Sequence, residues 1–302
     1  MSKQIIIRGD DFGVTHAANE GFRLYAEKGV ISAWSIMAPC PWFSEAIEIA
    51  KEYPNVDLGM HLTLMSEWAG YRWGPVLGAD RVPSLVDDKG YFPVNPTQFL
   101  NVSPVREEVE AELRAQIERV LAAGVDVLYI DNSHGNILHM LPLVNEVANQ
   151  LIKEYNLQAS PFVFDPTLEV ISSSAPTVEA KKEAYSKWLD TPQVIPGYRF
   201  VVVHPMLDHP EARALHLPPE MDVPFLQDII LHNIADTKAV ATDEFAQILK
   251  DKDYELVHYH NLPKSAQKHA IEVWPPEVLT QMFTMMGASA EVIEQVVSMS
   301  QS

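Results

Sequence analysis

Short apolar segments alternate with longer amphipathic segments along most of this 302-residue chain. In the longer segments, apolar residues recur every three or four positions, which indicates helices, whereas the short β-branched segments indicate buried strands. This alternation is typical of βαβ units around a parallel sheet, and the length suits one α/β barrel domain. Seven strands are predicted, at Gln4–Arg8, Ile31–Met37, Asp57–Leu62, Val125–Ile130, Ala159–Phe164, Phe200–His204 and Leu256–His260.

The last part of the chain departs from the alternation. From Glu272 onward, apolar residues follow at helical spacing, which predicts one or two amphipathic helices whose apolar face must be covered. We therefore expect a (β/α)-barrel domain over residues 1–263 and a helical extension over residues 264–302. Packing of this extension on the barrel is the favoured interpretation, and a homodimer formed through it is the alternative.

Charge and composition limit the classes of partner. Forty-one acidic side chains against twenty-two basic ones give a formal net charge of -19, which disfavours nucleic acids and anionic membrane surfaces. A neutral or cationic ligand fits better. The single cysteine, Cys40, excludes an internal disulfide, and no apolar run approaches the ~18 residues of a membrane span. The simplest expectation is a soluble cytoplasmic protein.

Two adjacent carboxylates, Asp10 and Asp11, follow the first predicted strand at its glycine turn. Burying such charges costs several kcal/mol unless they are paired or bind a metal ion, so a divalent metal is the leading explanation. His61, His134 and His204 lie at or just after the ends of three other predicted strands. The carboxyl ends of parallel barrel strands share one face, where catalytic groups gather.

Each of these side chains also has an ordinary structural interpretation. A single histidine in a half-buried strand is more often a hydrogen-bonded core residue, and an Asp-Asp-Phe-Gly segment can be a simple turn. Two histidines with one carboxylate are nevertheless a known divalent-metal set, which favours zinc over magnesium. A second, weaker candidate is His258-Tyr259-His260, because strand residues two apart point the same way.

The segment from Ser66 to Leu100 lacks a regular period and contains Trp68, Tyr71 and Trp73. A loop of this length inside a compact domain is usually functional. Aromatic faces pack well on the apolar faces of sugar rings, which is one interpretation of these residues. A hydrophobic cluster that anchors the loop to the barrel is the other.

Taken together, these motifs resemble the YdjC/ChbG-type carbohydrate deacetylases over roughly residues 4–262. The motifs occur in the family's order, and it is their ordered set that is specific. They are Asp10-Asp11-Phe12-Gly13 with Asn19, Gly59-Met60-His61-Leu62-Thr63, Glu67-Trp68, Tyr71-Arg72-Trp73-Gly74-Pro75, Val105-Arg106-Glu107-Glu108 with Glu112 and Gln116, residues 131–135, and His204-Pro205.

The resemblance implies a distorted, TIM-like (β/α) barrel of seven parallel strands that uses one divalent metal ion, zinc or magnesium. Its substrates would be small carbohydrates, N-acetylated amino sugars such as short chitooligosaccharides, from which it releases acetate. The site residues it implies are Asp11, His61 and His134 as metal ligands, Asp10 as general base, His204 as general acid, and Tyr71, Arg72 and Trp73 in the substrate-binding loop.

In the mechanism that this assignment implies, a water activated by the ion attacks the acetamide carbonyl while Asp10 takes a proton and His204 gives one to the amine. The chain departs from the family pattern in having one more residue between Asp131 and His134, and in its tail after about Pro263. Two alternatives therefore stay open. One is a metal-dependent amide or ester hydrolase acting on a non-sugar substrate, and the other is a non-catalytic carbohydrate-binding homologue.

Overall fold

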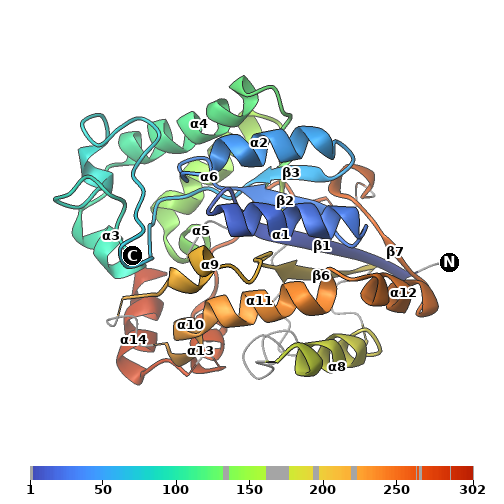
Figure 1. The fold of residues 1–302 in the computed structure, drawn as a ribbon. Coiled ribbons are helices and arrows are strands. Elements are labelled where there is room, and N and C mark those ends of the chain that lie inside the picture. The colour runs from blue at the N-terminus through green and yellow to red at the C-terminus, as the bar shows by residue number, and fades with distance from the viewer. Residues whose placement is uncertain are drawn as a thin grey trace.

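The computed structural model describes residues 3–131, 136–160, 177–192, 197–218, 223–262, 264, 267–285 and 287–301. Within them, seven parallel strands form one curved sheet in the order β5-β4-β3-β2-β1-β6, and β7 also pairs with β1 (Figure 1). The strands are β1 Lys3–Phe12, β2 Ala33–Ile36, β3 Asp57–Met60, β4 Tyr129–Ile130, β5 Gln158–Ala159, β6 Tyr198–Val203 and β7 Tyr254–Leu256. All seven predicted strands are therefore confirmed, although their bounds differ, and residues 161–164 of the fifth predicted strand lie outside the described residues.

The long strand β1 organises the sheet. Its residues Gln4–Gly9 pair with β6, while Arg8–Phe12 and Lys3–Ile5 pair with β2 and β7 respectively. Since β6 pairs along one edge of β1, β2 and β7 both pair along the opposite edge. There β7 pairs with the beginning of β1 and β2 pairs with its end. Ile5, Ile6 and Ile7 are fully buried, as expected for a strand covered on both faces.

Helices surround the curved sheet, whose inner face is filled by side chains that include Ile6, Tyr129 and Phe200. Figure 1 shows α2 and α4 on one side, and α8 and α11 on the opposite side. The helices are α1 His16–Glu27, α2 Phe43–Glu52, α3 Pro96–Asn101, α4 Arg106–Ala122, α5 Ile137–Met140, α6 Pro142–Glu154, α8 Val178–Trp188, α9 Pro210–Ala214, α10 Pro224–Gln227, α11 Ile229–Val240, α12 Asp243–Asp251, α13 Pro276–Met285 and α14 Ala290–Met299, with short 3₁₀ turns η1 Pro83–Leu85 and η3 Tyr259–Asn261. None of the helices in the described ranges is long and apolar enough to cross a membrane.

Helix α4 holds the long segment that follows β3. Glu112 is buried and accepts hydrogen bonds from the backbone N–H groups of Val76 and Leu77, at 2.9 and 3.1 Å. One turn later, Gln116 bonds both the N–H and the C=O of Thr63, at 2.9 and 2.7 Å. This polar edge of α4 satisfies backbone groups that would otherwise be buried without partners.

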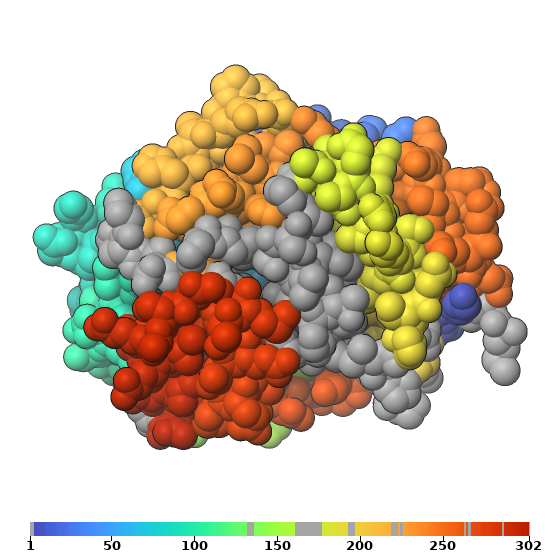
Figure 2. All heavy atoms as spheres, turned by 90° about the horizontal axis from the view of Figure 1, so that it is seen from below, coloured from blue at the N-terminus to red at the C-terminus, as the bar shows by residue number. Residues whose placement is uncertain are grey.

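The C-terminal helices α13 and α14 pack together and lie against the rest of the chain. Leu279 and Met282 of α13, and Val296 and Met299 of α14, are buried and belong to the main core cluster. The preceding Trp274 stacks on His139 of α5, with ring centroids 4.5 Å apart, and its backbone N–H donates to the His139 carbonyl at 2.8 Å. Figure 2 shows this pair of helices as one compact patch at the surface.

Candidate active site

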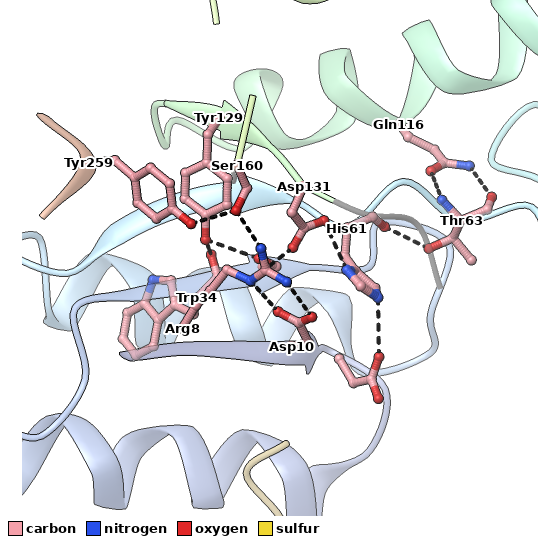
Figure 3. Close-up of polar contacts among 12 residues, drawn as sticks. Arg8, Asp10, Trp34, His61, Thr63, Gln116, Tyr129, Asp131, Ser160 and Tyr259 are labelled. Atoms are coloured by element: carbon pink, nitrogen blue, oxygen red, sulfur yellow. Dashed lines mark hydrogen bonds and ion pairs between the residues drawn. The ribbon is translucent and has the colours of Figure 1, made fainter. Parts of the chain in front are cut away.

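Asp10 forms a buried ion pair with Arg8, two residues earlier on the same face of β1 (Figure 3). Arg8 donates through Nε and Nη2 to the two carboxylate oxygens of Asp10, at 2.7 Å each. Burial alone would raise the pKa of Asp10, but the Arg8 guanidinium lowers it below its usual value. The predicted base is thus held in one orientation as a carboxylate.

Asp11 and His61 meet because β1 is irregular at this point. The pairing with β2 shifts register between Gly9 and Phe12, and Asp11 adopts a left-handed conformation with φ of 72°. Neighbouring residues of a regular strand point to opposite faces. Here the irregularity brings Asp11 Oδ1 to 3.5 Å from His61 Nε2, so both carboxylates of the pair lie near His61.

Asp131 directly follows β4 and is fully buried. Its Oδ1 lies 3.0 Å from His61 Nδ1, and its Oδ2 lies 3.4 Å from Arg8 Nε (Figure 3). Burial raises the pKa of Asp131, and nearby Asp10 adds to that effect. Although burial opposes it, the charge and hydrogen bond of Asp131 raise the pKa of His61. Sequence reasoning gave Asp131 no role, although its position at a strand end was the available signal.

Three further residues complete the surroundings of Arg8. Its Nη1 donates to Ser160 Oγ at 2.6 Å, and the Ser160 hydroxyl lies 2.6 Å from that of Tyr259. The guanidinium also lies 5.3 Å from the centre of the Phe200 ring. The sequence did not predict these contacts of Arg8, because the partners lie far away in the chain; Ser160, for example, is 152 residues away.

His204 directly follows β6 and is half-buried. Electrostatic interactions connect it with two carboxylates, those of Asp10 and Asp236. Gly21 of α1 packs against the backbone of Pro205 and Met206, which fixes the chain just after His204. His134, the predicted third ligand, lies outside the described residues.

The predicted binding loop is held in shape by contacts of Arg72 and Trp73 within the segment that follows β3. Trp73 is buried, and its indole Nε1 donates to the Met65 carbonyl at 2.9 Å. Arg72 pairs with Asp87 at 3.1 Å. These contacts fit the anchoring interpretation of the loop, and its role in binding substrate stays a prediction.

Tyr71 links the same loop to the candidate site. It is half-buried, and its hydroxyl donates to the Val14 carbonyl at 2.6 Å. Val14 belongs to the turn that follows Asp11. The loop therefore reaches the edge of the site through Tyr71.

The donor set suits a divalent metal ion. A carboxylate can only accept a hydrogen bond, so the His61 Nδ1 that faces Asp131 carries hydrogen and leaves Nε2 as the ligand atom on the side of Asp11. Metal-binding histidines are typically oriented by such a carboxylate on their other ring nitrogen. One ligand atom from each of Asp10, His61 and Asp131 also lies within 4.8 Å of the others, and this set shares only His61 with the predicted ligands Asp11, His61 and His134.

A model of the YdjC-like protein family matches residues 4–251. The chain belongs to the YdjC-like family. A relative of this YdjC-like protein, the "Carbohydrate deacetylase" of Brevibacillus brevis, is 28% identical over 262 residues, covering 86% of this chain and 99% of the relative. "Carbohydrate deacetylase 1" of Listeria innocua is 37% identical over 158 residues, covering 51% of this chain and 59% of that protein, less than two thirds of its length.

The fold is also found in a solved structure. The crystal structure of a putative cellobiose-phosphate cleavage protein from Enterococcus faecalis V583 aligns with a TM-score of 0.68 and 23% identity, covering 86% of this chain and 98% of the other. At this identity the likeness concerns the fold alone. It agrees with the predicted TIM-like architecture of the YdjC-like protein.

Proposed function

We propose that this YdjC-like protein is a carbohydrate deacetylase, a metal-dependent hydrolase that removes N-acetyl groups from amino sugars or short chitooligosaccharides and releases acetate. The observation that carries the proposal is the meeting of Asp10, Asp11 and Asp131 around His61 at the carboxyl ends of β1, β3 and β4. Relatives named carbohydrate deacetylase support the choice of reaction and substrate.

The metal would be held by Asp11 and His61, with His134 proposed as the third ligand. Imidazole ligands favour zinc, whereas magnesium prefers oxygen ligands and water. Such an ion supplies Lewis-acid polarisation of the acetamide carbonyl. Asp131 orients the His61 ring so that Nε2 lies on the side of Asp11.

Proton transfer would fall to Asp10 and His204. Arg8 keeps Asp10 ionised and fixed, which prepares its carboxylate to accept a proton from the attacking water. His204 enters from a different strand, β6, and would donate a proton to the departing amine. The products are acetate and a free amino sugar, and the acidic character of the chain suits the cationic product.

Substrate binding would involve the loop that carries Tyr71, Arg72 and Trp73. Tyr71 has the most direct connection, since its hydroxyl fixes it to the turn after Asp11. Arg72 and Trp73 make contacts within the loop, so they would set the loop's shape. We propose that this shape, rather than each side chain alone, selects a small carbohydrate.

The proposal is tested by acetate release from diacetylchitobiose with the zinc-loaded protein. Asp10→Asn should reduce the rate by about 10²–10⁴-fold, the usual contribution of a positioned base, while zinc content is retained. Asp126→Asn alters an exposed carboxylate and serves as the control. An unchanged rate in Asp10→Asn would rule out the assigned base.

A substrate panel separates the rival functions. Activity confined to simple acetamides or esters would identify a hydrolase of non-sugar substrates. Carbohydrate binding without acetate release or metal affinity would identify a non-catalytic homologue.

A further inference from the structure

We propose that Asp57, His258 and His260 form a second divalent-metal site, separate from the candidate active site. Asp57 begins β3, and both histidines follow β7. One ligand atom from each of the three residues lies within 4.8 Å of the other two. Nothing in the proposed deacetylation uses these side chains.

The Asp57 carboxylate accepts two hydrogen bonds from His260. Its Oδ1 lies 2.6 Å from His260 Nδ1, and its Oδ2 accepts from the His260 backbone N–H at 3.3 Å. Ligand atoms of one first-row metal ion, each bonded at about 2.0–2.2 Å, lie about 3 Å apart. A small increase in the distance between Asp57 Oδ1 and His260 Nδ1 would therefore leave room for an ion bound to both atoms. The ion would displace the proton that these two atoms share.

His258 is held in a defined tautomer that leaves one ring nitrogen able to bind an ion. Its Nδ1 lies 2.9 Å from the Ser32 carbonyl oxygen, which can only accept, so Nδ1 carries the hydrogen and Nε2 carries the lone pair. Histidine ligands of metals are commonly held by a backbone carbonyl in this way. The His258 and His260 rings lie with centroids 5.2 Å apart at 29°. An Asp57–His260 ion pair alone would not require this third, oriented imidazole.

The site combines a buried anchor with access from solvent. The Asp57 side chain is 7% exposed, whereas that of His260 is 53% exposed. His258 is half-buried. An ion can thus reach the site from solvent past His260 and bind the buried Asp57 carboxylate. Water would complete its coordination.

The cluster is distinct from the candidate active site because the two lie at opposite ends of β3. Asp57 is the first residue of β3, and His61 directly follows its last residue. Four residues of extended strand span about 13 Å at ~3.3 Å per residue. One ion cannot be shared between them.

Ligand chemistry indicates the class of ion. Two imidazoles and one carboxylate suit zinc, cobalt or nickel and disfavour magnesium and calcium, which take oxygen ligands. The cluster should therefore bind Zn²⁺ and Co²⁺ in preference to Mg²⁺.

The test is calorimetric titration of chelator-treated protein with Zn²⁺, repeated with Co²⁺ by visible absorption. His260→Gln and His258→Gln should each lose one bound equivalent, with the corresponding Co²⁺ absorption. His61→Gln should retain that equivalent, which separates this site from the catalytic one. His209→Gln and His216→Gln alter exposed histidines elsewhere and should bind as wild type does.

The result that would overturn the proposal is equally direct. If His258→Gln and His260→Gln bind as many equivalents of Zn²⁺ as wild type and the His209→Gln control do, the cluster is an ion pair only. Circular dichroism of each variant establishes that the fold is intact, and the exposure of His260 makes His260→Gln the variant least able to disturb it.

Discussion

The Asp131 carboxylate faces the Nδ1 atom of His61 at 3.0 Å, while the Nε2 atom of the same ring lies 3.5 Å from Asp11. His61 therefore lies between two carboxylates from different parts of the sheet, one near each of its ring nitrogens. The arrangement assigns Asp131 to the orientation of the ring and Asp11 to the binding of an ion.

Replacing Asp131 by asparagine should weaken metal binding at His61. An amide can present its NH₂ group to Nδ1 and reverse the tautomer, and loss of such a partner usually costs 10–100-fold in affinity. Zn²⁺ titration of Asp131→Asn should show this decrease, with the exposed Asp126→Asn variant as the control. Equal affinities in the two variants would contradict the orienting role.

Replacing Arg8 by methionine should strongly destabilise the fold. The change leaves buried Asp10 and Asp131 without their guanidinium, and breaking a buried ion pair typically costs about 3–5 kcal/mol. Urea denaturation should show this loss in Arg8→Met. Arg23→Met, which removes the more exposed Arg23–Glu52 pair, should cost at most about 1 kcal/mol. Similar stabilities for the two variants would argue against the central place of Arg8.

Replacing Gly21 by alanine should impair catalysis from outside the site. An added Cβ would lie 2.8 Å from the Met206 nitrogen and 2.9 Å from the Pro205 carbonyl carbon, so the backbone after His204 must move. A displacement of about 1 Å can cost roughly 10²-fold in rate. The measurement is kcat for acetate release, compared with Glu27→Ala on the exposed face of the same helix. Wild-type kcat in Gly21→Ala would show that this contact does not position His204.

Stability should fall on acidification because of His139. Burial lowers its pKa from 6.5 to about 4, although a hydrogen bond to the Glu272 carbonyl opposes the shift. Between these two values the unfolded chain binds more protons than the folded one, so stability is fully present above pH 6.5 and is lost towards pH 4. The loss attributable to this histidine is about 3 kcal/mol.

Denaturation midpoints measured across this pH range check the effect. His139→Phe keeps an aromatic ring against Trp274 but cannot titrate, so its stability should depend less steeply on pH. The same pH dependence in the variant and in wild type would rule out His139 as the source.

The strand pattern of the fold could be predicted because central parallel strands are continuously apolar. Strand ends were predicted less well, since hydrogen-bond partners define them. Val125 and Val127 have the right residue type, yet pairing in β4 is confined to Tyr129–Ile130. Similarly, β7 ends at Leu256, and His260 lies in a 3₁₀ turn rather than in the strand.

The candidate site was predictable where its residues place ligand-type side chains at or just after strand ends, as Asp10, Asp11 and His61 do. Arg8 was not, because an arginine within an apolar strand is informative only once its buried partners are known. Ser160 lies 152 residues away in the chain, and its contact with Arg8 has no local signal.

The contact of Arg8 with Ser160, and of Ser160 with Tyr259, has a consequence for biosynthesis. The residues that hold Asp10 in place range from Arg8 to Tyr259, and the ribosome adds Tyr259 long after Asp10. Because domains begin to fold from the N-terminus during synthesis, Asp10 is present long before its environment is complete. A chain terminated before β7 would contain the proposed ligands Asp11, His61 and His134. It would lack Tyr259, which helps to hold Arg8 against Asp10 through Ser160.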